Sequence, residues 1–370
     1  MPYSQLDRTK LNVKPLSERP NKVNIERDFV PVSQQPENTG EHFTTTVQDT
    51  VERIRAARKN GAPIMLTFGA HTIKNGMGPV IIKLMEEGWL THLATNGAGI
   101  IHDWEFAFQG ASSEDVRKNV EMGQFGIWQE TGYYLNLAIV VGAFEGKGYG
   151  ESVGSMIQNE GIEIPEGDRL KEIAAELAGN DLDRAAAALD LLDTIQRFDI
   201  PPGWMAIPFP TKNYCVQAAA FRLGIPFTGH PMIGHDIIYT HPINHGAAIG
   251  RTAQRDFLTF AHSVNQLDQG VYMSVGSAVM SPMIFEKSLS MSQNLHIQQD
   301  SHIDHHFMLI VDLAKSTWDW QKDGEPPKSD PGYYLRYLKT FSRMGGVMRY
   351  LSADNRDFLL AIYHELCGKG

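Results

Sequence analysis

Histidine and aspartate side chains recur in short segments of this 370-residue sequence. Residues 225–250 contain four histidines and Asp236, and His102 follows an apolar run further upstream. Histidine has an ordinary pKa close to neutral pH, so it is a frequent general base. A carboxylate beside it can bind a sugar hydroxyl or orient the imidazole. His102, or another strand-end histidine such as His241, is therefore predicted to act as general base, with Asp236 orienting the substrate or the base.

The same side chains have the chemistry of metal ligands. Zinc sites use three or four His, Cys or carboxylate ligands. Two groups qualify by residue type: His235, Asp236, His241 and His245; and His302, Asp304, His305 and His306. Neither group has an established ligand spacing, and histidines of an α/β chain more often serve as hydrogen-bonded or packing residues. No metal site is assigned.

The stretch 64–110 predicts the element that positions such side chains. An apolar run, 64–68, ends at Gly69, and a polar turn leads to a helix from Pro79. A second apolar run, 90–95, leads through a glycine-containing loop, 96–99, to a helix from Ile100. Alternating strands and helices favour a parallel sheet with right-handed crossovers. Ligands of such sheets bind at the carboxyl ends of the strands, where 70–72 and 96–99 fall.

This stretch resembles deoxyhypusine synthase, a family with a Thr-Ser-Asn loop after one strand and a Thr-Thr-Ala-Gly-Gly-Val-Glu-Glu-Asp segment after the next. The corresponding segments here are 70–76 and 95–103. A shorter patch, 234–241, is similar to the family's Leu-Gly-Asp-Met-Ile-Tyr-Phe-His, and the strand 307–312 ends where the family has an Asp-Ala pair.

The resemblance implies a Rossmann-like α/β fold, a mostly parallel sheet with helices on both faces, that binds NAD. It also implies a contact of Asp236 with substrate and a place for Asp103 in the site. The cofactor-binding residues that it implies are Ala70, His71, Thr72, Lys74, Asn96, Gly97, Ala98, Gly99 and Asp312.

Two departures separate the chain from that family. The acidic pair before Asp103 is replaced by Ile101 and His102, and the family's Ser-Trp-Gly-Lys motif is absent. Lys287 is the only lysine between residues 277 and 307. A covalent lysine needs burial or a neighbouring cation to lower its pKa, and a polyamine needs carboxylates to replace its hydration. We therefore expect a different substrate from that of deoxyhypusine synthase.

Composition limits the class of protein. The chain is 42% hydrophobic, with a net charge of −10 and a pI of about 5.8, which does not favour nucleic-acid binding. A membrane span needs about 18 or more consecutive apolar residues. The sequence contains no such run, so no membrane span is expected. Residues 1–40 lack a signal-peptide pattern. Cys215 and Cys367 could pair, but free thiols in a reducing cytosol are favoured. We expect a cytoplasmic protein with a small-molecule substrate.

The remaining segments suggest the domain organisation. Residues 1–44 predict an extended N-terminal arm, which wraps a neighbouring subunit or forms a partly disordered tail, and 45–370 predict a single α/β domain. Residues 333–351 and 354–367 predict helices that cover the sheet. The glycine-rich segment 144–154 could cradle a phosphate or simply connect two helices. By resemblance to a tetrameric family, a homo-oligomer (tetramer or dimer) is expected.

Together these patterns predict an NAD-dependent enzyme that transfers a hydride between NAD and a small substrate bearing an amine or a hydroxyl. An alternative within enzymes is NAD-dependent transfer of an aminobutyl group from a polyamine. An alternative outside enzymes is a non-catalytic nucleotide-binding or assembly protein.

Overall fold

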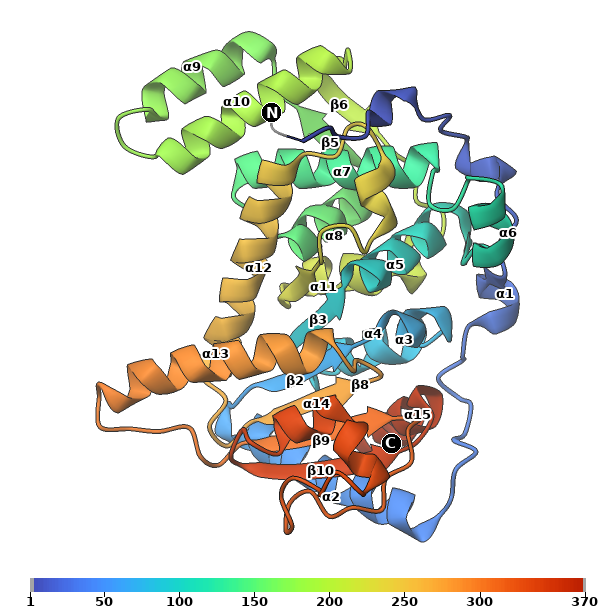
Figure 1. The fold of residues 1–370 in the computed structure, drawn as a ribbon, viewed down its shortest axis with the longest axis vertical. Coiled ribbons are helices and arrows are strands. Elements are labelled where there is room, and N and C mark those ends of the chain that lie inside the picture. Colours follow the sequence, from blue (N-terminus) through green and yellow to red (C-terminus); the bar gives the residue numbers. More distant parts are fainter. Residues whose placement is uncertain (1–2, 369–370) are drawn as a thin grey trace.

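A computed structural model describes residues 3–368, and its centre is a six-stranded parallel sheet (Figure 1). Its strands are β2 (Ile64–Phe68), β3 (His92–Asn96), β7 (Phe227–His230), β8 (Val271–Val275), β9 (Phe307–Asp312) and β10 (Val347–Ser352). Their spatial order is β10-β9-β8-β2-β3-β7, and all neighbours are parallel. The chain builds outward from β2 to one edge, then returns to β8 and builds to the other. This is the doubly wound order of Rossmann-like folds.

Helices cover both faces of this sheet. The helices are α1 (Ile25–Asp28), α2 (Glu41–Asn60), α3 (Ala70–Lys74), α4 (Gly78–Glu86), α5 (Gly97–Gln109), α6 (Val116–Glu121), α7 (Gln129–Glu145), α8 (Tyr149–Asn159), α9 (Gly167–Leu177), α10 (Leu182–Arg197), α11 (Val216–Leu223), α12 (Gly246–Asn265), α13 (Met280–Ile297), α14 (Arg336–Phe341) and α15 (Asn355–Cys367). Short strands form two antiparallel pairs outside the main sheet: β1 (Val23–Asn24) with β4 (Ala111–Ser112), and β5 (Gly161–Ile164) with β6 (Gly203–Ala206).

Alternation of side chains along the strands explains the two layers. Met65 and Tyr272 point to one face and pack with apolar residues of α12, α13 and α14. Leu66 and Met273 point to the other face and pack with α2, α4 and α15. All five residues of β2 and of β8 are buried, as expected for central strands covered on both sides. The predicted fold class is therefore correct.

Three local expectations differ from the structure. Residues 333–351 do not form one helix: α14 ends before Gly345 and Gly346, which both have positive φ, and the chain then enters β10. The expected polar turn after β2 contains α3, and α5 begins at Gly97 instead of Ile100. Both helices therefore start directly at the strand ends.

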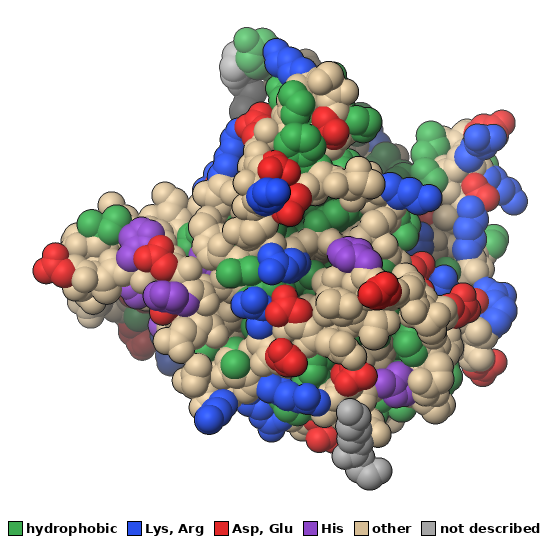
Figure 2. All heavy atoms as spheres, turned by 90° about the horizontal axis from the view of Figure 1, so that it is seen from below, with side chains coloured by type: hydrophobic (Ala, Val, Ile, Leu, Met, Phe, Trp, Pro, Cys, Tyr) green, Lys and Arg blue, Asp and Glu red, His purple; other side chains and the backbone are tan. Residues whose placement is uncertain are grey.

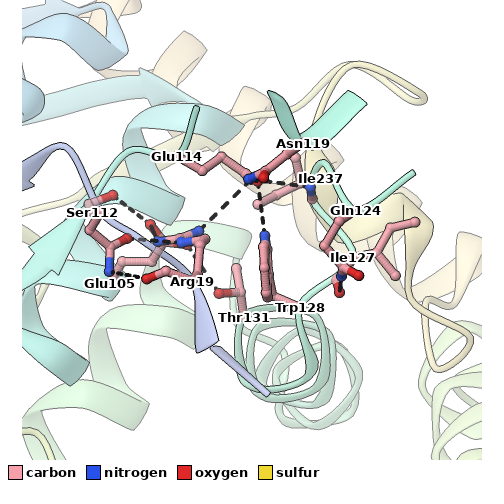
Figure 3. Close-up of polar contacts among 12 residues, drawn as sticks. Arg19, Glu105, Ser112, Glu114, Asn119, Gln124, Ile127, Trp128, Thr131 and Ile237 are labelled. Atoms are coloured by element: carbon pink, nitrogen blue, oxygen red, sulfur yellow. Dashed lines mark hydrogen bonds and ion pairs between the residues drawn. The ribbon is translucent and has the colours of Figure 1, made fainter. Parts of the chain in front are cut away.

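The N-terminal arm packs against its own chain. It runs along the side of the molecule past α5 and α7 (Figure 1), and its β1 pairs with β4. Leu16 and Val30 are buried, and Arg19 is only 5% exposed. The Arg19 guanidinium donates to both carboxylate oxygens of Glu105 on α5, at 2.8 and 2.7 Å (Figure 3). This buried ion pair holds the arm in place.

No helix among residues 3–368 is both long and apolar enough to cross a membrane. Cys215 is buried, Cys367 is half-buried, and the two are not joined to each other.

Removing the Arg19 charge should destabilise the fold strongly. Burial by itself would raise the pKa of Glu105, and the Arg19 guanidinium outweighs burial so that the pKa of this carboxyl is lowered. Arg19→Met leaves that carboxylate buried and unpaired, at a cost of about 3–5 kcal/mol in the free energy of unfolding at pH 7. Urea unfolding measures it. The loss should shrink at lower pH, where Glu105 can take up a proton.

The matched control is Arg169→Met, which removes an exposed arginine that pairs with Glu172 on α9. It should leave stability unchanged. Equal stability of the Arg19→Met and Arg169→Met proteins would show that the arm is not anchored by this pair.

Candidate functional site

The carboxyl ends of four neighbouring strands surround the first candidate cavity. It has a volume of about 230 Å³ and extends from α3, which follows β2, over the carboxyl ends of β8, β9 and β10, beside the point where the strand order reverses. Its lining residues are His71, Asn75, Gly276, Val311, Asp312, Leu313, Ala353, Asp354 and Asn355. Ligands of doubly wound sheets bind in such a crevice. We refer to it as the switch-point cavity.

The backbones of β2 and β8 approach each other closely at this cavity. A Cβ atom on Gly69 would lie 2.0 Å from the carbonyl oxygen of Gly276, and Gly276 itself has a φ of +60°. Glycine is therefore required at both positions. Gly276 also lines the cavity without presenting a side chain to it.

A second cavity, of about 200 Å³, lies beside the N-terminal half of α5. We refer to it as the His102 cavity. Its lining residues are Arg19, Lys74, Ala98, Ile101, His102, Glu105, Ser113, Glu114, Val116, Phe125, His235, Asp236 and Ile237. It combines charges of both signs with an apolar wall, as binding sites for small polar molecules do.

A hydrogen-bond chain orients His102 within this cavity. Glu105 holds two bonds from Arg19 and one from the Ser112 hydroxyl, and the pKa of Glu105 is lowered, so the carboxylate accepts from Ser112. Ser112 Oγ lies 2.6 Å from His102 Nδ1 and must accept, because its proton is already donated (Figure 3 shows the Ser112–Glu105–Arg19 part). Nδ1 therefore carries the ring proton and Nε2 has a free lone pair. Burial lowers the pKa of His102 to about 4, which keeps the ring neutral near pH 7.

Asp236 presents a buried carboxyl to the N-terminus of α5. Its Oδ2 has no hydrogen-bond partner among the described residues. Burial raises the pKa of Asp236 to about 6, against a smaller lowering by His235. A Cβ atom on Gly97 would lie 2.2 Å from Oδ2. Gly97 therefore makes room for Asp236, and the carboxyl titrates close to neutral pH, as a group that exchanges protons should.

The residues predicted to bind cofactor divide between the two cavities. His71 and Asp312 line the switch-point cavity, whereas Lys74 and Ala98 line the His102 cavity. His71 and Lys74 stand three residues apart on α3, which separates the two spaces. Burial and the Lys74 charge lower the pKa of His71.

The other predicted cofactor residues hold local structure. Asn96 caps α5 by accepting from the Gly99 amide at 2.9 Å. A Cβ atom on Gly99 would lie 2.2 Å from Thr95 Oγ1, so this glycine also serves close packing. Thr72 is buried and accepts from Asn355 at 3.3 Å, and Ala70 is the first residue of α3. Gly97 and Gly99 thus approach side chains of this chain at the positions where cofactor contact was expected.

Asp103 and His241 line neither cavity. Asp103 is 1% exposed and accepts from the backbone amides of Val216 and Gln217 at the start of α11 and from the Cys215 thiol. Asp103 is therefore placed to cap the N-terminus of α11, and this differs from the role in the site that was expected of it. His241 lies at 3.2 Å from Gln129, and burial lowers its pKa to about 4. Its ring packs against Gly132 of α7.

The glycine-rich segment 144–154 meets a carboxyl group of the same chain. Asp256 of α12 accepts from the Gly150 amide at 2.9 Å and from the Gly229 amide at 2.6 Å. A Cβ atom on Gly148 would lie 1.8 Å from its Oδ1. Asp256 therefore occupies the start of α8, which leaves the amides there satisfied without a phosphate. The structure therefore supports the second interpretation of this segment, which is a connection between the two helices α7 and α8.

Two histidines of the second candidate metal-ligand group pair with carboxylates on the surface, whereas a third, His306, is fully buried. His302 lies 2.7 Å from Asp304, and His305 lies 3.2 Å from Asp268. Figure 2 shows histidine and acidic side chains together on the protrusion that the end of α13 forms. Within the part of the chain that the structure describes, no group of three or more His, Cys, Asp or Glu side chains is arranged to hold a metal ion.

The sequence did not reveal the residues that orient His102. Arg19, Glu105 and Ser112 come from the arm, α5 and β4, and Glu114 accepts from Trp128 Nε1 at 3.0 Å beside them (Figure 3). Charged residues in an amphipathic helix usually face solvent, so no local signal marked Glu105 as buried. Arg19 is one of three arginines in the arm, with Arg8 and Arg27, so its residue type did not mark it either.

Comparison with known proteins gives weak structural likenesses. No protein-family model matches the sequence, and no curated protein matches it by sequence search. AgrE superposes with a TM-score of 0.45 and 14% identity over 90% of this chain and 34% of AgrE, so the chain spans about a third of that protein. AgrE has also been solved as a ternary complex with ornithine and NAD⁺.

Two further solved structures have comparable scores. A conserved LOR/SDH protein of Methanococcus maripaludis S2 has a TM-score of 0.42 and 12% identity over 94% of this chain and 73% of its own. A protein of Entamoeba histolytica assigned as a deoxyhypusine synthase has a TM-score of 0.40 and 10% identity over 89% of both chains. Likenesses of this size are too low to transfer a ligand or an activity.

The tautomer of His102 can be tested directly. In protein labelled with ¹⁵N-histidine, the His102 signals, assigned by their loss in His102→Gln, should show a protonated Nδ1 and an unprotonated Nε2 at pH 7. Ser112→Ala removes the acceptor for Nδ1–H, so the proportion of this tautomer should fall.

Thr131→Val is the matched control. Thr131 Oγ1 donates to Glu105 at 3.1 Å and has no hydrogen bond to His102. This variant should keep the Nδ1–H tautomer. A protonated Nε2 in the unaltered protein would overturn the assigned hydrogen-bond directions.

Proposed function

We propose that this chain is an NAD-dependent enzyme that binds its dinucleotide in the switch-point cavity and oxidises or reduces a small substrate in the His102 cavity. The observation that carries the proposal is the position of the first cavity at the carboxyl ends of β8, β9 and β10, beside the point where the strand order of this doubly wound sheet reverses. The glycine fingerprint G-x-G-x-x-G does not follow β2. Support therefore comes from strand order and cavity lining.

The lining of the switch-point cavity fits a dinucleotide. Asp312 Oδ1 accepts a hydrogen bond from the Ala314 amide at 3.1 Å. The second carboxylate oxygen can then accept from a ribose hydroxyl. Asn75 and Asn355 add amide groups, and the absence of side chains on Gly276 allows close approach of a ligand. Bound NAD would supply the hydride acceptor or donor.

The His102 cavity supplies the groups that move a proton. When a substrate carbon bearing a hydroxyl or an amine loses a hydride, the heteroatom must also lose a proton. His102 Nε2 is free to accept it, and Asp236 can receive a proton or orient the substrate, because its pKa lies near 6. The apolar wall formed by Ile101 and Phe125 would exclude water from the reacting carbon.

The structure does not favour aminobutyl transfer. Lys287 has a side chain that is 50% exposed and pairs with Glu286, so it has neither the burial nor the neighbouring cation that a nucleophilic lysine needs. Lys74 lies in the His102 cavity and remains the only lysine in its lining. A non-catalytic nucleotide-binding protein would have no need for an oriented, unprotonated Nε2.

Two substitutions should separate cofactor binding from chemistry. Asp312→Asn keeps the bond to Ala314 but removes the anionic acceptor, and hydrogen bonds to charged groups contribute about 1.5–3 kcal/mol. The Kd of NAD, measured by calorimetry, should rise at least about tenfold. His102→Ala should keep the Kd and lower turnover about 10²-fold or more in a screen of small alcohols and amines that follows NADH.

The control is Asp304→Asn, an exposed carboxylate on the loop after α13, which should change neither quantity. Failure of the unaltered protein to bind NAD or NADP at millimolar concentrations would refute the proposal. Full turnover in His102→Ala would transfer the role of base to another group.

We also propose that the enzyme is a cytoplasmic homo-oligomer. Support comes from apolar side chains along α13 that are 40–60% exposed, which on a monomer would leave a hydrophobic stripe in water. They are Met283, Met291, Leu295 and Ile297. The two unpaired cysteines fit a reducing compartment.

Light scattering tests the assembly. The proposed dimer or tetramer has a multiple of the 41.3 kDa chain mass at micromolar concentration. Met283→Glu with Leu295→Glu should shift the mass towards the monomer, because each buries a charge in the interface. A mass of one chain for the unaltered protein would exclude the oligomer.

A further inference from the structure

A third cavity lies between the N-terminal arm and α3. It has a volume of about 400 Å³, and its lining residues are Lys22, Val23, Arg27, Asp28, Phe29, Val30, Gln34, Lys74, Asn75 and Arg356. One side is formed by residues 22–34 of the arm, and the other by the end of α3 and the start of α15. We refer to it as the arm cavity.

The lining of the arm cavity is strongly basic. Four of its residues are Lys or Arg, and Asp28 is its single carboxylate. The whole chain carries a net charge of −10, so this excess of positive charge is local. Clefts lined by charges of one sign concentrate ions of the opposite sign. The arm cavity is therefore suited to an anion.

Three of the four cations have an ion-pair partner, and the fourth does not. Lys22 pairs with Asp115 at 3.0 Å, Arg27 with Asp28 at 2.7 Å, and Arg356 with Asp354 at 3.3 Å. Within residues 3–368, the half-buried Lys74 ammonium has neither an ion-pair nor a hydrogen-bond partner. An anion in the cavity would supply the missing counter-charge.

The arm cavity borders both candidate sites. It shares Lys74 with the His102 cavity and Asn75 with the switch-point cavity. A charged group bound there could belong to a molecule that extends from either side. Lysine and arginine together with amide donors match the oxygens of a phosphate group.

We propose that the arm cavity binds a phosphate monoester through Lys74, Arg356 and the arm cations. The phosphate belongs either to the 2′-position of a dinucleotide in the switch-point cavity or to a phosphorylated substrate in the His102 cavity. The choice between these sources rests on the proposed function, whereas the phosphate site itself does not.

The first experiment uses inorganic phosphate as the probe and the full-length protein without dinucleotide. Calorimetry should show saturable binding at millimolar concentrations. Lys74→Gln should weaken it about tenfold, since it removes the only unpaired cation, and Arg356→Gln should weaken it by a smaller factor. Arg197→Gln, which removes an equally exposed, ion-paired arginine from α10, should leave it unchanged. Thermal unfolding confirms that each variant is folded.

The second experiment distinguishes the sources. If the phosphate is the 2′-group, NADP binds more tightly than NAD, and Lys74→Gln and Arg356→Gln both remove the difference. If it belongs to the substrate, NAD and NADP bind equally, and glycerol 3-phosphate competes with inorganic phosphate whereas glycerol does not.

Two outcomes would overturn the proposal. One is the absence of saturable phosphate binding, and the other is unchanged phosphate affinity in folded Lys74→Gln and Arg356→Gln proteins. Binding of phosphate without binding of either dinucleotide would refute the proposed function and leave the phosphate site standing.

Discussion

The ion pair between Arg19 and Glu105 is the interaction on which the candidate site depends. It is buried, so its two charges must compensate each other, and it joins a residue of the arm to one in the middle of α5. The same carboxylate accepts from Ser112 and Thr131. This one ion pair therefore anchors the arm. It also fixes which atoms donate and which accept in the hydrogen bonds that lead to His102, and it holds one wall of the His102 cavity.

The strands and the main helices could be predicted because their signals are local. The strand β2 is buried throughout and mostly apolar, and Gly61 ends α2 in a left-handed conformation that glycine favours. The strand β10 was missed because only Met348 and Leu351 are buried in it. These two residues are three positions apart, so the segment lacks the alternation that marks a strand. The adjacent pair Gly345 and Gly346 was the signal that a helix could not continue through this segment.

The site was less predictable because its contacts join distant parts of the chain. His102 and Asp236 were recognised by residue type, and the structure brings both into one cavity. Gly97 was interpreted as a place for close approach of a cofactor, and close approach does occur there, but to the carboxyl group of Asp236. A glycine such as Gly97 allows another group of the protein or a ligand to come close to the backbone. Which group comes near is decided by folding that places residue 236 beside residue 97.

The short helix α3 contributes a lining residue to each of the two cavities. It begins at Ala70, directly after Gly69, which lies against Gly276. The turn after α3 is held by the arm, because the Val30 amide donates to the Gly76 carbonyl at 3.0 Å. A Cβ atom on Gly76 would lie 2.3 Å from the Asp28 carbonyl oxygen, so the arm contacts this turn without a gap. The arm is thus tied to α5 through Arg19 and to the turn after α3 through Val30. Because α3 carries His71 into one cavity and Lys74 into the other, a displacement of the arm would alter both cavities together.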